Sequence, residues 1–144
     1  IDTAGSDHAP HTEEEKSGPY MKTPSGMPSI QHTLPVIVTL FGNTQDGLKR
    51  IASAFSEKAA DIFGIEDRGR LEAGYHADIV VVDIDAGFIV GKKNIAYKCG
   101  WSPYEGEKLK GRIEHVFVNG RHSVCNGRLQ ADATAAGRQL VFSR

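Results

Sequence analysis

Apolar residues in the stretch 33–63 recur every three or four positions, which is the spacing of helices that bury one face. In the first such run Thr33 is expected to cap the helix. Pro35 is acceptable there because the first helical turn needs no backbone donor at that point. The pattern predicts a helix that starts near Thr33 and ends before Gly42.

Two further helices are predicted by the residues that follow. Asp46 is expected to cap the second helix and Ser56 the third. Gly64 then fits the left-handed position that commonly follows a helix. The apolar positions that support these helices are Leu48, Ile51, Ala52, Phe55, Ala59, Ala60 and Phe63.

After Gly64 the apolar pattern changes from helical to strand-like. Residues 79–82 are a continuous β-branched run, which is typical of a strand covered on both faces. Residues 113–118 and 121–125 flank an Asn-Gly pair, the preferred sequence of a type I′ turn, and are predicted to form a hairpin. This part of the chain is therefore expected to be mostly β.

The two ends of the chain are less regular. Residues 1–6 are expected to form one short strand, and residues 12–28 a long loop that is either a binding loop or a disordered terminus. A small helix is predicted at residues 131–136 and a last strand at residues 140–142. A lone strand needs partners for its backbone groups. Because the chain also starts at Ile1 rather than methionine, we expect those partners in a longer parent chain.

Composition excludes several classes of partner. The chain has 144 residues, a net charge of -1 and a pI near 6.6, without a basic stripe, so neither nucleic acid nor a membrane is an expected partner. No apolar run approaches the length of a membrane span, and no signal peptide is visible. Cys99 and Cys125 are too few for a disulfide framework and too far apart for a Cys-x-x-Cys metal site. We expect two reduced thiols in a cytoplasmic protein.

The strongest chemical signal is the run Asp7-His8-Ala9-Pro10-His11. Pro10 fixes its own φ and disfavours helical backbone at Ala9, so an extended turn is predicted. Neighbouring side chains of an extended segment point to opposite faces, so Asp7 and His8 are expected to have different roles. A carboxylate at a strand end with a histidine four residues later is either a catalytic corner or a simple turn former.

Several segments resemble, in order, the dihydroorotases of the amidohydrolase superfamily. Residues 5–11 (GSDHAPH) are similar to the family motif at the last barrel strand. Residues 26–35 (GMPSIQHTLP) resemble its loop into the last barrel helix. Residues 69–83 resemble the return of the chain into a β-sandwich, and residues 98–106 resemble a segment of bacterial dihydroorotases.

This resemblance implies an α/β fold made of two parts. Residues 1–64 would hold the last strand, the active-site loop and the terminal helices of a (β/α)8 (TIM) barrel of a metal-dependent hydrolase. Residues 65–144 would be the C-terminal part of its small β-sandwich. The end of the eighth strand would then lie at the face where barrel active sites are built.

The resemblance also implies a reaction, the reversible hydrolysis of dihydroorotate to N-carbamoyl-L-aspartate in pyrimidine biosynthesis. Zinc lowers the pKa of bound water to about 7, and a base must take the proton and return it to the departing nitrogen. Asp7 matches the family residue that is both zinc ligand and general acid and base. His11 matches the histidine that binds the substrate carboxylate, and Gly26 lies where the loop backbone approaches the substrate ring. His8 is expected to brace the strand end.

The other zinc ligands of the family lie on barrel strands that this sequence does not contain. They are a His-x-His pair, a carbamylated lysine and two further histidines, and together they hold one or two zinc ions. Asp7 alone cannot hold a catalytic zinc, which usually has three protein ligands. We therefore expect this chain alone to be inactive and the activity to belong to the longer parent, which by resemblance is a homodimer.

Two alternatives remain open. One is a related cyclic amidase, such as allantoinase or dihydropyrimidinase (hydantoinase), although these usually differ from dihydroorotases at the position of His11. The other is a non-catalytic dihydroorotase homologue that serves as an assembly partner of aspartate transcarbamoylase. Asp7 and His11 favour a catalytic protein over this second alternative.

Overall fold

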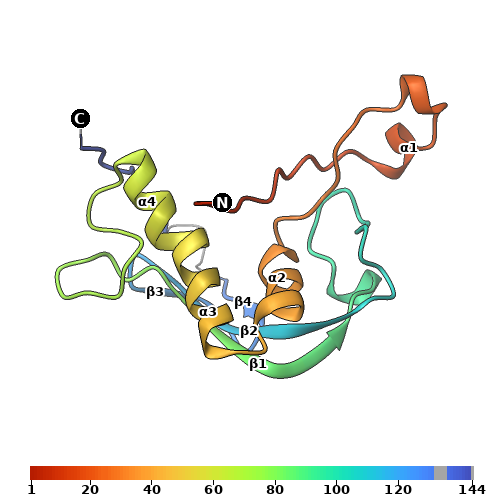
Figure 1. The fold of residues 1–144 in the computed structure, drawn as a ribbon. Coiled ribbons are helices and arrows are strands. Elements are labelled where there is room, and N and C mark those ends of the chain that lie inside the picture. Colours follow the sequence, from red (N-terminus) through yellow and green to blue (C-terminus); the bar gives the residue numbers. More distant parts are fainter. Residues whose placement is uncertain (132–135, 144) are drawn as a thin grey trace.

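The structure is a computed structural model that describes residues 1–131 and 136–143. Its strands form one antiparallel sheet in the order β1-β2-β3-β4, and helix α2 packs on β2 (Figure 1). The strands are β1 (Ile79–Ile89), β2 (Lys108–Val118), β3 (Arg121–Cys125) and β4 (Arg128–Leu129). The helical elements are α1 (Glu13–Lys16), η1 (Tyr20–Lys22), α2 (Thr33–Phe41), α3 (Gln45–Ala52), η2 (Ser53–Glu57), α4 (Lys58–Phe63) and η3 (Lys92–Asn94).

Helix α2 begins and ends close to the predicted positions. Thr33 is its first residue rather than its cap, because the hydroxyl of Thr33 donates to the carbonyl of Ser29 at 2.9 Å. Gly42 ends the helix, as predicted. The helix packs on β2 through Val38, whose side chain would lie 2.8 Å from a Cβ at Gly111. A glycine at this point of β2 therefore lets the helix approach the sheet.

The second and third predicted helices form one continuous rod. The cap of α3 is Thr44, whose hydroxyl accepts the Gly47 N–H at 3.0 Å, so the prediction of Asp46 was wrong by two residues. Ser56 starts no new helix, because the chain passes from α3 through the π-helical turn η2 into α4 without a break. Gly64 ends the rod with a φ of 62°, in the left-handed conformation that was predicted.

The hairpin is confirmed, and residues 79–82 form part of strand β1 as predicted, but the prediction that this strand is covered on both faces was wrong. Asn119 and Gly120 have φ values of 49° and 78°, and a type I′ turn requires positive values at both positions. Among the described strands β1 lies at the edge of the sheet and pairs with β2, and its residues Val80 and Val81 are 47% and 42% exposed. A cleft of about 640 Å³ between α3 and β1 leaves the helix-facing side of the strand incompletely covered.

The N-terminal residues form an extended arm rather than a strand (Figure 1). Residues 1–6 form no ladder with a described strand; the Ala4 N–H donates instead to the carbonyl of Ala54 at 3.1 Å, and the nearest pairing is the single bridge between His8 and Met27. The loop predicted at residues 12–28 contains the short elements α1 and η1. Helix α1 forms because Thr12 and Glu15 cap each other, with the Glu15 carboxylate accepting the Thr12 N–H at 2.7 Å.

No helix within the described parts of the chain is long and apolar enough to cross a membrane. The small helix predicted at residues 131–136 falls mostly on residues 132–135, which lie outside the described residues. The predicted last strand is reduced to one bridge, in which Phe142 pairs with Ile65.

Candidate active site

Asp7 occupies a turn with unusual backbone geometry. Its φ is 45°, in the left-handed region that residues other than glycine adopt only when the surroundings hold them there. The residue is exposed. Across residues 1–131 and 136–143, no group bonds to the Asp7 carboxylate, so both of its oxygens are available to a ligand. The Asp7 side chain can therefore supply an oxygen ligand to a metal ion.

His8 fixes this turn to the loop that precedes α2. Its Nδ1 accepts a hydrogen bond from the backbone N–H of Ser29 at 3.0 Å. The Ser29 hydroxyl donates back to the carbonyl of Ser6 at 2.6 Å, and the Ala9 N–H donates to the carbonyl of Met27 at 3.0 Å. His8 thus braces the end of the N-terminal segment, as expected, while Asp7 is left to face outward.

His11 is held by its backbone and faces a carboxylate. The indole N–H of Trp101 donates to the His11 carbonyl at 2.7 Å. The His11 ring nitrogen Nδ1 lies 3.6 Å from a carboxylate oxygen of Glu15. Hydrogen bonds from the backbone and hydroxyl of Thr12 lower the pKa of Glu15, and His11 contributes to the same shift. The Glu15 carboxylate that lies beside the His11 ring is therefore favoured in its ionised form.

Gly26 lies against the Asp7–His11 turn. Its φ is 97°, and a Cβ at this position would lie 2.5 Å from the Cβ of Ala9. The Lys16 ammonium donates to the carbonyls of Pro24 and Gly26 at 2.7 and 3.1 Å, which ties the loop to α1. The backbone can take this path only with glycine, both for its conformation and for its close approach to Ala9.

The buried His32 is connected to His8 through Tyr97, which contacts both rings. His32 is 1% exposed, and its Nδ1 lies 3.1 Å from the Ser102 hydroxyl and 3.3 Å from the Tyr97 hydroxyl. Tyr97 also packs on His8, with ring centroids 5.3 Å apart. Burial lowers the pKa of His32, and its Nε2 has no hydrogen-bond partner among the described residues. Nothing in the sequence around His32 signals this burial.

The structure therefore brings the three residues predicted from the sequence into one unit. Asp7 and His11 lie in the same turn, and the loop with Gly26 is bonded to that turn. Sequence reasoning missed a second group of metal-ligand side chains, His115, His122 and Cys125, whose ligand atoms lie within 4.8 Å of one another.

Comparison with known proteins shows similarity to amidohydrolases. Residues 3–122 match the model of the amidohydrolase family. A dihydroorotase of Halobacterium salinarum is 34% identical over 106 residues, which cover 74% of this chain and 25% of that protein. An allantoinase of Desulfitobacterium hafniense is 30% identical over 125 residues, which cover 86% of this chain and 28% of the allantoinase.

The fold has a solved counterpart. The structure of the L-hydantoinase (dihydropyrimidinase) from Arthrobacter aurescens aligns with a TM-score of 0.83 and 28% identity, over 91% of this chain and 30% of that one. The chain thus spans 25–30% of the length of the proteins it matches. Its helices and small antiparallel sheet correspond to a piece of a TIM-barrel-type α/β protein.

Proposed function

Because this chain belongs to the amidohydrolase family, we propose that it is the C-terminal segment of an enzyme that hydrolyses a C–N bond in a cyclic amide. The substrate that we propose is dihydroorotate, which is opened to N-carbamoyl-L-aspartate in pyrimidine biosynthesis. The observation that carries the proposal is the outward-facing Asp7 carboxylate, unbonded within the described residues and held in a left-handed turn. Dihydroorotases among its relatives support the choice of substrate.

In this proposal Asp7 moves the proton. Hydrolysis forms a bond between a water oxygen and the amide carbon and breaks the C–N bond, so one proton must travel from the water to the departing nitrogen. The Asp7 carboxylate takes that proton and then returns it, which is general base and general acid catalysis by one group. The left-handed backbone and the His8–Ser29 bond keep the carboxylate turned outward while it does so.

His11 and Gly26 would bind the substrate. A ring N–H of His11 can donate a hydrogen bond to a substrate carboxylate, and the charge of that carboxylate strengthens the bond. The absence of a side chain at Gly26 lets the loop backbone approach the substrate ring. A residue that recognises a carboxylate favours dihydroorotate over substrates that carry none.

Zinc is the cofactor that we propose. The free Asp7 oxygens fit this ion, which accepts carboxylate ligands. When bound, zinc supplies a Lewis acid that makes water acidic enough to lose a proton near neutral pH. Among the described residues, Asp7 belongs to no group of three possible metal ligands, so the other ligands would come from parts of the protein outside this chain. Residues 1–144 alone are therefore expected not to turn over dihydroorotate, even with added zinc.

A second candidate is a related cyclic amidase. The allantoinase relative and the hydantoinase structures favour it. Their identities to this chain, 30%, 27% and 28%, are close to the 34% of the Halobacterium salinarum dihydroorotase. The test is a panel of dihydroorotate, allantoin, hydantoin and dihydrouracil, assayed with the full-length zinc-loaded protein. We expect the highest kcat/KM for dihydroorotate. A higher value for a ring without a carboxylate would favour the second candidate, and no hydrolysis of any would favour a non-catalytic assembly protein.

A further inference from the structure

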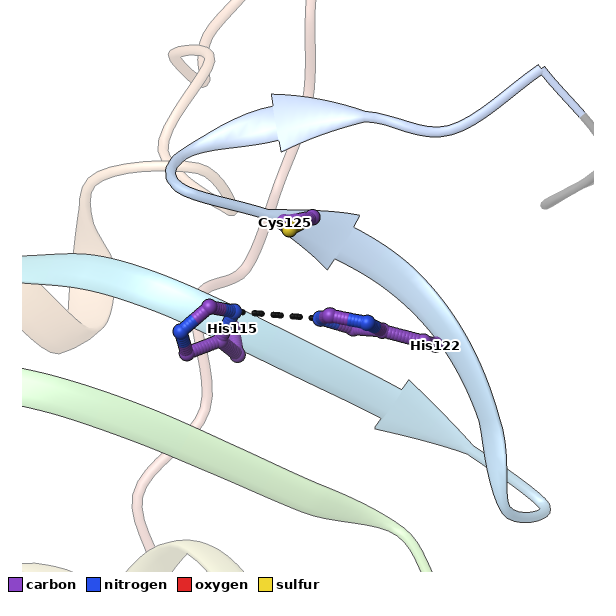
Figure 2. Close-up of side chains that lie close together, drawn as sticks. All are labelled: His115, His122 and Cys125. Atoms are coloured by element: carbon purple, nitrogen blue, oxygen red, sulfur yellow. Dashed lines mark hydrogen bonds between the residues drawn. The ribbon is translucent and has the colours of Figure 1, made fainter.

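Two imidazoles and a thiol meet on the β2–β3 hairpin. His115 comes from β2, and His122 and Cys125 come from β3 (Figure 2). Their ligand atoms all lie within 4.8 Å of one another, and Nδ1 of His115 is 3.1 Å from Nε2 of His122. All three residues are half-buried. None of them belongs to the turn that contains Asp7 and His11.

A β-bulge gathers these side chains on one face. His122 and Cys125 are three positions apart, and a regular strand would point them to opposite faces. In the ladder Val116 pairs with Val124, but the next residue, Phe117, pairs with His122. Ser123 is the extra residue of this bulge and is only 6% exposed. The bulge reverses the alternation and brings His122 to the face on which Cys125 lies opposite His115.

The two imidazole nitrogens have a spacing close to that of a tetrahedral metal site, and the Cys125 sulfur lies within 4.8 Å of both. Zinc binds imidazole nitrogen at about 2.0–2.1 Å and thiolate sulfur at about 2.3 Å, so tetrahedral angles place two nitrogens about 3.4 Å apart and nitrogen and sulfur about 3.6 Å apart. The observed nitrogen–nitrogen distance of 3.1 Å differs from this by a few tenths of an ångström. The present hydrogen bond between the imidazoles would be exchanged for bonds to the ion.

The ring of His122 is already oriented. It stacks on Phe117 with centroids 4.4 Å apart and an angle of 13° between the ring planes. Figure 2 shows its nitrogen pointing toward His115, with Cys125 at the adjacent position of the same strand face. A ligand whose rotamer is held by packing loses little conformational freedom when it binds a metal ion.

From this arrangement we propose that His115, His122 and Cys125 form a binding site for a thiophilic divalent transition-metal ion, zinc above all. Two nitrogens and one sulfur match the ligand preference of zinc rather than that of magnesium or calcium. Three protein ligands leave a fourth position for water. The bound ion would cross-link β2 to β3. Because the thiol must lose its proton, affinity falls as the pH is lowered.

Cobalt(II) tests this site directly. The chelator-treated chain of residues 1–144 is titrated with Co²⁺, with its folding checked by circular dichroism, and the same titration is made on the full-length protein. We expect a thiolate-to-cobalt charge-transfer absorption that saturates at one ion per chain and is removed by Zn²⁺. Asp7 carries no sulfur, so this absorption does not report on the proposed hydrolytic site. Its outcome is therefore independent of the proposed function.

Matched variants identify the ligands. C125S should abolish the charge-transfer absorption, whereas C99S, which changes the other half-buried thiol, should keep it. H122F keeps an aromatic ring on Phe117 but removes the donor, and should weaken Co²⁺ binding by at least about tenfold. H76F is the histidine control and should leave binding unchanged. In the chain of residues 1–144, Zn²⁺ should raise the Tm of the unchanged protein and not that of C125S. A folded protein without the absorption, or an absorption that survives C125S, would overturn the proposal.

Discussion

The indole N–H of Trp101 donates a hydrogen bond of 2.7 Å to the carbonyl oxygen of His11, although 90 residues separate the two in the chain. Trp101 belongs to the segment between β1 and β2 that lies beside the N-terminal arm (Figure 1). In the same region the Lys92 ammonium lies 2.9 Å from a carboxylate oxygen of Glu13. The N-terminal segment from Asp7 to Glu13 is thus held by the later, β-rich part of the chain.

Removing this donor should loosen His11 without removing a catalytic group. Trp101→Phe keeps an aromatic ring but leaves the His11 carbonyl without its partner, a loss of about 0.5–1.5 kcal/mol. In the full-length protein we expect KM for dihydroorotate to rise about two- to tenfold, with kcat little changed. Steady-state kinetics check this. An equal fall in kcat with KM unchanged would contradict a role in holding the substrate-binding residue.

Gly26 should not tolerate a side chain. Gly26→Ala places a Cβ 2.5 Å from the Cβ of Ala9 and forces alanine into a φ of 97°. We expect the free energy of unfolding to fall by about 1–3 kcal/mol, measured by urea denaturation. Gly5→Ala is the matched control, because a Cβ at Gly5 meets nothing within 4 Å. Adding Ala9→Gly should recover only the part of the loss due to the contact, and equal stability of the two single variants would contradict the account.

His32 should make stability fall in mild acid. Burial lowers its pKa from the ordinary value of 6.5, so the unfolded chain takes up a proton at a higher pH than the folded chain does. The free energy of unfolding therefore decreases as the pH drops below about 6.5, until the folded-state pKa of His32 is reached.

The variant His32→Phe isolates this effect. It keeps an aromatic ring among Phe88, Tyr97 and Tyr104 but cannot be protonated. We expect its free energy of unfolding to change less than that of the unchanged protein between neutral pH and about pH 5.5. His76→Asn serves as the histidine control and should keep the original pH dependence. Urea denaturation at the two pH values measures the difference, and an equal pH dependence in His32→Phe would refute the assignment.

Local signals in the sequence predicted local structure well. The Asn119 and Gly120 pair specified its turn, and Gly64 its helix end, because each depends on backbone conformations that few residues adopt. The cap of α3 was misplaced because both Thr44 and Asp46 are good capping residues, and only the hydrogen bond to Gly47 distinguishes them. The exposure of Val80 depends on β1 having one neighbour, which no local pattern reveals.

The candidate site was predicted through its motif rather than through its contacts. The residues from Asp7 to His11 are adjacent in sequence, so a resemblance could find them. The bonds from Ser29 to His8 and from Trp101 to His11 join distant segments and needed the fold. The group of His115, His122 and Cys125 was missed for the same reason, because the bulge at Ser123 has no clear sequence signal. In a regular strand His122 and Cys125, three positions apart, would point to opposite faces.

The most direct test of the central proposal is the kcat/KM of the full-length, zinc-loaded protein for dihydroorotate after Asp7→Asn. This change keeps the shape of the side chain and removes its basicity, so we expect a loss of about 10²–10⁴-fold or more with the fold intact. Asp2→Asn, a nearby exposed carboxylate of the same arm, should leave the rate within about twofold. A folded Asp7→Asn protein that hydrolyses dihydroorotate at the unchanged rate would contradict the proposal that Asp7 carries the proton.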